Sequence, residues 1–131
     1  MDKIIAVDFD GCLVANRYPD IGEPINETIV AVLQEQYRGA KIILWTCRSG
    51  GLLDDAVAWC EGRGIRLAAA NRNLPETIAA FGGDTRKIHA DAYWDDKARR
   101  MPCKWPPGQE GGGAEYGGED MRGVPVALPR R

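Results

Sequence analysis

The sequence predicts an α/β fold, a three-layer α/β/α sandwich around a mainly parallel, Rossmann-like sheet. Short apolar runs typical of buried strands alternate with segments of helical periodicity up to about residue 100. Polar residues follow each apolar run directly, as they do at the carboxyl edge of a parallel sheet, where such folds bind ligands. With 131 residues, 44% of them hydrophobic, the chain is large enough for one core.

The first element is an apolar strand that begins at Lys3 and ends in two acids, Asp8 and Asp10. Residues two apart on a strand project to the same side, so these two like charges are expected to lie close together. Such a pair is costly unless a divalent cation, phosphoryl chemistry or a strong hydrogen-bond network uses it. The pair therefore points to a magnesium-dependent phosphoryl site.

The later elements follow from apolar periodicity and from glycine or proline at their ends. After a turn-rich segment at 16–24, Ile25, Ile29 and Leu33 recur every four residues and predict a helix with Asn26 as its cap and Gly39 as its stop. The same signals predict strands at 41–47, 65–70 and 90–94, a helix from 52 to 62 or 64, and a helix at 75–81.

The chain changes character after residue 101. We place the core at residues 1–106 and a Gly/Pro-rich C-terminal extension at residues 107–131. Seven of the 17 residues at 107–123 are glycine, without an apolar period, so no regular structure is expected there. A short edge strand is expected at 124–128.

Composition excludes several classes of protein. A net charge of -2 and a pI near 5.4 give no general attraction to nucleic acid or to an anionic membrane. No apolar run approaches the roughly 20 residues that cross a bilayer, and the chain opens without the pattern of a signal peptide. The four cysteines form no C-x-x-C pair and His89 is the only histidine, so neither a zinc site nor a disulfide framework is predicted. We expect a cytoplasmic protein with free thiols.

Polar residues that carry chemistry collect at the predicted strand ends. Strand by strand they are Asp8 and Asp10, Thr46 and Arg48, Asn71 and Arg72, and Asp95 and Asp96. Because the carboxyl ends of parallel strands meet at one edge, these side chains are expected to converge there.

The order of these residues resembles the four-motif signature of the haloacid dehalogenase superfamily of phosphatases. The matching elements are Asp8-x-Asp10-Gly11, Thr46 after an apolar strand, Lys87, and Asp95-Asp96 after another strand, over residues 1 to about 100. Within that superfamily, the segments 18–22, 44–48 and 86–96 resemble a group of very small hydrolase-like proteins without a cap domain. The resemblance implies a haloacid dehalogenase-like core with no cap and a Mg²⁺-dependent phosphomonoester hydrolase.

The resemblance also implies a role for each motif residue. Asp8 is the nucleophile that forms an aspartyl-phosphate. Asp10 protonates the leaving oxygen and later takes a proton from water, with its backbone carbonyl available to the metal. Thr46 and Lys87 contact the transferring phosphoryl oxygens. The metal set is Asp8, Asp10, Asp95 and Asp96, of which Asp95 ligates directly, whereas Asp96 binds through water or orients Lys87.

Residues at the predicted rim are candidates for choosing the substrate. Arg48, Asn71 and Arg72 are expected to contact a second anionic group, and Arg86 is an alternative to Lys87 as the inward cation. An open, capless site suits a phosphorylated small molecule or a 5′-phosphorylated nucleic acid end, or closure by a homo-oligomer.

Three other classes of function are alternatives to a phosphatase. A response-regulator receiver needs adjacent acids at the end of strand one and a phosphoacceptor acid on strand three, and this chain has neither. A dehalogenase is disfavoured, because Asp10 has no role when halide departs. A non-catalytic or weakly active binding or regulatory module that keeps the fold stays open as the alternative to a phosphatase.

Overall fold

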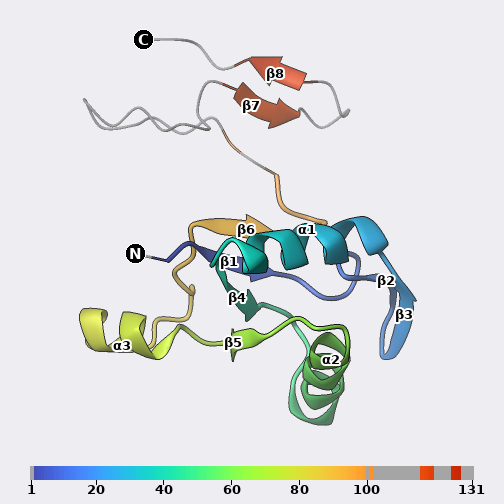
Figure 1. Cartoon of the computed structure of the whole chain (residues 1–131), viewed down its shortest axis with the longest axis horizontal. Coiled ribbons are helices and arrows are strands. Elements are labelled where there is room, and N and C mark those ends of the chain that lie inside the picture. The colour runs from blue at the N-terminus through green and yellow to red at the C-terminus, as the bar shows by residue number, and fades with distance from the viewer. Residues whose placement is uncertain (1, 100, 102–115, 120–124, 128–131) are drawn as a thin grey trace. The chain divides into compact units, whose positions relative to one another are not determined.

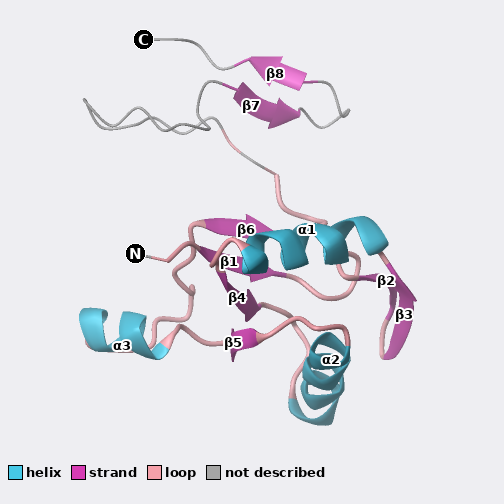
Figure 2. Ribbon diagram, in the orientation of Figure 1, coloured by secondary structure: helices cyan, strands magenta, loops and turns pink. Residues whose placement is uncertain are grey.

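The computed structural model describes residues 2–99, 101, 116–119 and 125–127, and it has an α/β fold. The chain divides into two compact units, Met1–Asp96 and Lys97–Arg131. The first unit holds a four-stranded parallel sheet, an antiparallel hairpin and three helices, and the second holds a two-stranded ribbon, as Figure 1 and Figure 2 show.

The main sheet has the order β5-β4-β1-β6, and every neighbouring pair is parallel. Its strands are β1 (Ile4–Val7), β4 (Lys41–Leu44), β5 (Leu67–Ala70) and β6 (Ala92–Trp94). The four predicted strands are therefore all present, although β4, β5 and β6 are shorter than the predicted spans 41–47, 65–70 and 90–94. Because all four run the same way, their carboxyl ends lie at one edge of the sheet (Figure 1).

The three predicted helices are also present, as α1 (Asn26–Tyr37), α2 (Gly50–Gly62) and α3 (Pro75–Phe81). Asn26, expected as a cap, is the first helical residue instead, and Ile25 stands at the cap with no side-chain hydrogen bond to the helix. Pro75 lies in the first turn of α3, where its missing N–H costs nothing, and Gly82 ends the helix in a left-handed conformation.

Apolar side chains fill both faces of the main sheet, and alternation along β1 divides them. Ile5 and Val7 belong to one cluster, which includes Ile29 and Val32 of α1 and Ala56 and Cys60 of α2. Ile4 and Ala6 belong to the other, with Ile43, Ala69, Leu74 and Ile88. Since burying one large aliphatic side chain contributes about 1.5–3 kcal/mol, these clusters are the main source of stability.

The segment predicted as turn-rich forms an antiparallel hairpin of β2 (Val14–Arg17) and β3 (Asp20–Pro24). Residues 18 and 19 form its tip, and their peptide bond is cis. Gly22 is required where the strands approach closely, because an added Cβ would overlap the carbonyl of Ala15. Figure 1 shows the hairpin on the side of the sheet to which the parallel strands point.

The second unit contains β7 (Tyr116–Glu119) and β8 (Pro125–Ala127), which pair antiparallel. The short strand expected at 124–128 is present as β8, but the expectation of no regular structure at 107–123 is wrong at β7. The predicted boundary between residues 106 and 107 falls outside the described residues. Among the residues that are described, none of the helices has the length and apolar character needed to cross a bilayer.

Candidate functional site

Backbone hydrogen bonds continue past the strand ends and fix the start of each loop at the carboxyl edge. The N–H of Asp8 donates to the Trp94 carbonyl at 2.9 Å, and that of Trp45 donates to the Val7 carbonyl at 2.9 Å. On the other side of β4, the N–H of Asn71 donates to the Leu44 carbonyl at 2.8 Å. The loops that carry the candidate residues therefore begin from a rigid base.

Three carboxylates converge at this edge. Asp8 follows β1, Asp95 and Asp96 follow the neighbouring β6, and one oxygen from each lies within 4.8 Å of the others. Asp8 is partly buried, whereas Asp95 and Asp96 are exposed. Oxygen donors in this arrangement are the kind that hard divalent cations take.

Burial and the neighbouring acids make ionised Asp8 costly. The pKa of Asp8 is raised to about 6, chiefly by burial and also by the charges of Asp95 and Asp96. The N–H of Phe9 opposes them, since it donates to Asp8 Oδ1 at 2.8 Å and lowers the pKa. The cluster therefore concentrates negative charge around one half-buried carboxylate.

Gly11 allows Asp96 to reach this cluster. Its φ is +86°, and an added Cβ would lie 2.7 Å from the Asp96 Cγ. The preceding turn is tight, because the Phe9 carbonyl accepts the N–H groups of Cys12 and Leu13 at 3.1 and 2.9 Å. Only glycine fits here, both for its backbone conformation and for the carboxylate packed against it.

The Asp10 carboxylate pairs with Arg48 instead of joining the cluster. Arg48 Nε donates to Asp10 Oδ2 and Nη2 donates to Oδ1, each at 2.8 Å. We expected Arg48 at the rim of the site, and this placement is wrong: the side chain is only 1% exposed. Sequence reasoning missed the pair because the direction of Arg48, two residues past Thr46, depends on contacts with the hairpin.

Thr46 and Asn71 form a network that holds the loop after β4. The Thr46 N–H donates to Asn71 Oδ1 at 2.8 Å, and Asn71 Nδ2 donates to the Arg48 carbonyl at 3.1 Å. Thr46 Oγ1 accepts the Arg48 N–H at 3.1 Å. Asn71 has a φ of +55°, a left-handed conformation that asparagine tolerates. In this structure Asn71 braces a neighbouring loop, and Arg72 beside it is exposed.

Lys87 lies on an exposed segment that also includes Arg86. Its ammonium lies 5.8 Å from the centroid of the Tyr93 ring on β6. The Lys87 ammonium thus lies over an aromatic ring, so its predicted part in the site requires the side chain to swing towards the carboxylates.

The segment that carries Lys87 is anchored by Asn73, a buried residue that sequence reasoning did not single out. Asn73 Nδ2 donates to Asp84 Oδ1 at 2.8 Å, and Asn73 Oδ1 accepts the His89 N–H at 2.6 Å. A lone asparagine before Leu-Pro carries no sequence signal for this role.

Cys12 lies next to the carboxylates but is no nucleophile. Burial and the nearby charge of Asp8 raise the pKa of its thiol to about 11, and Sγ lies 3.6 Å from the Trp94 carbonyl oxygen. The thiol therefore stays protonated near neutral pH. Cys47 is exposed, and Cys103 lies outside the described residues.

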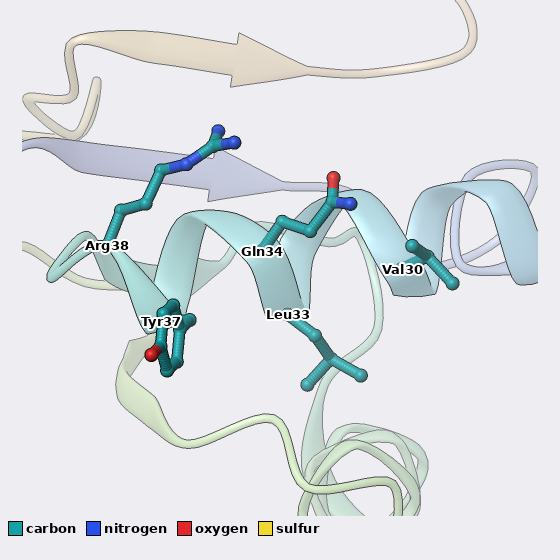
Figure 3. A pocket seen from close by; sticks show the side chains of 5 residues that line it. All are labelled: Val30, Leu33, Gln34, Tyr37 and Arg38. Atoms are coloured by element: carbon teal, nitrogen blue, oxygen red, sulfur yellow. The ribbon is translucent and has the colours of Figure 1, made fainter.

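A separate apolar depression lies on α1, lined by Val30, Leu33, Gln34, Tyr37 and Arg38 (Figure 3). α1 runs back towards the start of β4 (Figure 1), so the end of the depression at Tyr37 and Arg38 leads to the amino edge of the sheet, whereas the carboxylates lie at the carboxyl edge. The depression is not part of the candidate site.

Comparison with known proteins gave one informative match. No family model matches the chain, and no curated protein does. A solved structure of a conserved protein from Bacteroides thetaiotaomicron is 42% identical, with a TM-score of 0.66, over 75% of this chain and 78% of that one.

Proposed function

The chain belongs to the same family as the conserved Bacteroides thetaiotaomicron protein, whose description gives no activity. We therefore propose a function from the residues of the site. The protein is a Mg²⁺-dependent phosphomonoester hydrolase that works through an aspartyl-phosphate on Asp8. The observation that carries the proposal is the convergence of Asp8, Asp95 and Asp96 at the carboxyl edge of a parallel sheet.

The proposal includes a haloacid dehalogenase-like, three-layer core without a cap domain. Support comes from the four motif elements in order and from apolar clusters on both faces of a parallel sheet. The only insertion between the first strand and α1 is the short hairpin, which leaves the carboxylates accessible.

The carboxylates fit a Mg²⁺ ion by their chemistry. Asp8, Asp95 and Asp96 would hold it, with the Asp10 backbone carbonyl as a further donor, because the Asp10 side chain is committed to Arg48. Burial and, to a smaller extent, repulsion from Asp95 and Asp96 raise the pKa of Asp8, and a bound cation would remove this cost of ionising the carboxylate. When bound, Mg²⁺ offsets the charge on the phosphoryl oxygens, which lets an anionic ester approach the anionic nucleophile.

The residues then divide the reaction into two displacements. A carboxylate oxygen of Asp8 attacks phosphorus, the bond from phosphorus to the ester oxygen breaks, and Asp10 gives its proton to that leaving oxygen. In the second displacement, water attacks the phosphorus of the aspartyl-phosphate while Asp10 takes up a proton from the water. Inorganic phosphate leaves, and both aspartates return to their starting states.

Thr46 and Lys87 complete the proposed set of phosphoryl contacts. Thr46 Oγ1 already accepts the Arg48 N–H, so its hydroxyl proton is available to donate to a phosphoryl oxygen. Lys87 reaches the same oxygens by swinging away from Tyr93 on its flexible stem. Arg72 is the exposed rim residue proposed to contact substrate, whereas Arg48 and Asn71 are occupied within the protein.

The proposed substrate is a phosphorylated small molecule or the 5′-phosphorylated end of a nucleic acid. An open site admits either class, and a second copy of the chain is a further means of covering it. We place the reaction in the cytoplasm, with no membrane partner.

A non-catalytic binding or regulatory module is the second candidate. The position of Lys87 favours it, because its ammonium lies over the Tyr93 ring. In that case the acidic cluster binds a cation without supporting turnover.

Hydrolysis of p-nitrophenyl phosphate separates the two candidates. We expect turnover with Mg²⁺ and none with EDTA, and we expect Asp8→Asn to lower kcat by at least about 10³-fold because the nucleophile is lost. Asp54→Asn, an exposed carboxylate on α2, is the matched control and should keep full activity. Equal turnover by wild type and Asp8→Asn would refute the proposed mechanism, and no turnover with retained Mg²⁺ binding would favour the non-catalytic module.

A further inference from the structure

We infer that Arg48 is a positioning residue for the proposed reaction: its buried guanidinium fork fixes the orientation of the Asp10 carboxylate and ties it to the tip of the β2–β3 hairpin. The inference rests on the proposed function, because it concerns the acid that serves that reaction. It concerns a residue that was expected to bind substrate.

The contact between Arg48 and Asp10 is a paired, two-point contact. Both carboxylate oxygens accept a guanidinium N–H at 2.8 Å, which fixes the plane of the carboxylate as well as its distance. The Arg48 side chain is 1% exposed and that of Asp10 is 16% exposed, so water competes little for either partner.

The hairpin tip holds the guanidinium group in turn. Nη1 of Arg48 donates to the Pro19 carbonyl at 3.1 Å and Nη2 donates to the Asp20 carbonyl at 2.9 Å. Four of its five N–H donors are thereby engaged. The rings of Phe9 and Tyr18 lie 5.0 and 5.3 Å from the guanidinium carbon. A guanidinium held by so many contacts presents its fork in one orientation.

The pairing leaves Asp10 able to transfer a proton. A carboxylate offers about four lone-pair sites, and Arg48 occupies one on each oxygen, so one further site on each oxygen remains for a proton. The orientation of the Asp10 carboxylate then decides how fast it transfers the proton, because a displacement of about 1 Å can lower the rate of a positioned reaction by 10²-fold. Lysine at position 48 would keep the charge but not the planar, two-point fork.

This role predicts a dependence on the leaving group. An alkyl phosphate expels a basic alkoxide that needs a proton as the bond breaks, whereas p-nitrophenolate departs readily without one. Misplacing Asp10 should therefore slow the alkyl ester far more than the aryl ester. A residue that only gripped the phosphate, or only supported the fold, would affect both esters alike.

The test compares kcat and KM of Arg48→Lys for ethyl phosphate and p-nitrophenyl phosphate in Mg²⁺. We expect kcat for ethyl phosphate to fall at least tenfold more than kcat for p-nitrophenyl phosphate, with KM within threefold of wild type for both. Arg72→Lys, an exposed arginine at the same edge, is the matched control and should show no such selectivity. In the Asp10→Asn background, Arg48→Lys should cause no further loss, because the residue it positions is gone.

Equal losses for the two esters, a loss confined to KM, or no loss would each overturn the inference. If Arg48→Lys does not fold, Tyr18→Ala provides the second test, since this ring is 56% exposed and its removal loosens the guanidinium from one side. That variant should show the same selectivity at about threefold, and equal slowing of both esters would overturn the inference. Failure of the proposed function appears separately, as undiminished turnover in Asp8→Asn.

Discussion

Replacing Asp8 by asparagine should stabilise the metal-free protein at neutral pH even though it removes the proposed nucleophile. The pKa of Asp8 is raised to about 6 by burial and by the neighbouring acids. In the unfolded chain an aspartate has a pKa of about 3.9. The folded state therefore binds the Asp8 proton more tightly than the unfolded chain does. The stability that this proton contributes is fully present below about pH 4 and is lost as the pH rises through about 6.

The magnitude follows from the size of that shift. About two pKa units correspond to about 3 kcal/mol, since one unit is about 1.4 kcal/mol. Asp8 is only partly buried, so solvent screening reduces the expected penalty at pH 7.5 to about 1–2 kcal/mol. Asparagine has nearly the same shape and keeps an oxygen for the Phe9 N–H, so the substitution removes little else.

Urea unfolding in EDTA at pH 4, 5, 6 and 7.5 measures the effect. The unfolding free energy of Asp8→Asn should exceed that of wild type by about 1–2 kcal/mol at pH 7.5, and the two curves should approach each other near pH 4. Asp54→Asn should follow the wild-type curve, because Asp54 is exposed on α2. A variant that is less stable than wild type at pH 7.5, or a difference that does not vary with pH, would refute the reasoning.

Magnesium should reverse the order of stability. At 100 times its dissociation constant a ligand adds about 2.7 kcal/mol to the folded state, so Mg²⁺ should stabilise wild type by more than it stabilises Asp8→Asn. Urea unfolding in the same concentration of Ca²⁺ is the control, because Ca²⁺ carries the same charge as Mg²⁺ but prefers a larger site with more ligands.

Two other predictions concern the surroundings of the carboxylates. Gly11→Ala should lower the unfolding free energy by about 1–3 kcal/mol, because it puts alanine in a left-handed backbone conformation and its Cβ against the Asp96 carboxylate. Gly51→Ala is the control, because a Cβ there, at the start of α2, meets open space and should cause no such loss. Equal urea midpoints for the two variants would contradict this account. Iodoacetamide at pH 7.5 should alkylate exposed Cys47 before Cys12 and Cys60, since burial raises the pKa of those thiols to about 11 and about 12. Peptide mapping by mass spectrometry gives the order, and labelling of Cys12 as fast as Cys47 would be the contrary result.

The parallel sheet was predictable because its signals are local. A continuous apolar run such as Ile42–Ile43–Leu44 fits a strand buried on both faces, and Pro75 fixes the start of a helix. Because the strands are parallel, their carboxyl ends all lie at one edge of the sheet. The sequence therefore predicted that Asp8 and Asp95 lie close together, as they do in the structure.

The hairpin was missed because its strands lack an alternating pattern. Val14 is buried while Asn16 and Arg17 are exposed, and in β3 only Gly22 is fully buried. Its tip is held by the guanidinium of Arg48, 28 residues beyond Asp20 in the chain. Contacts at that separation leave no periodic trace, so neither the hairpin nor the inward direction of Arg48 followed from the residues around them.

The continued backbone bonds at the strand ends separate rigid from movable parts of the site. The amides of Asp8, Trp45 and Asn71 are bonded within the sheet, so their exchange with solvent deuterium requires the sheet itself to open. At the exposed hairpin tip, the carbonyls of Pro19 and Asp20 accept hydrogen bonds from one arginine side chain, and the Tyr18 ring lies against the same guanidinium group. We therefore expect that loss of these contacts would loosen the tip while the amides of Asp8, Trp45 and Asn71 keep their protection, so the hairpin tip and the base of the carboxylates would open separately.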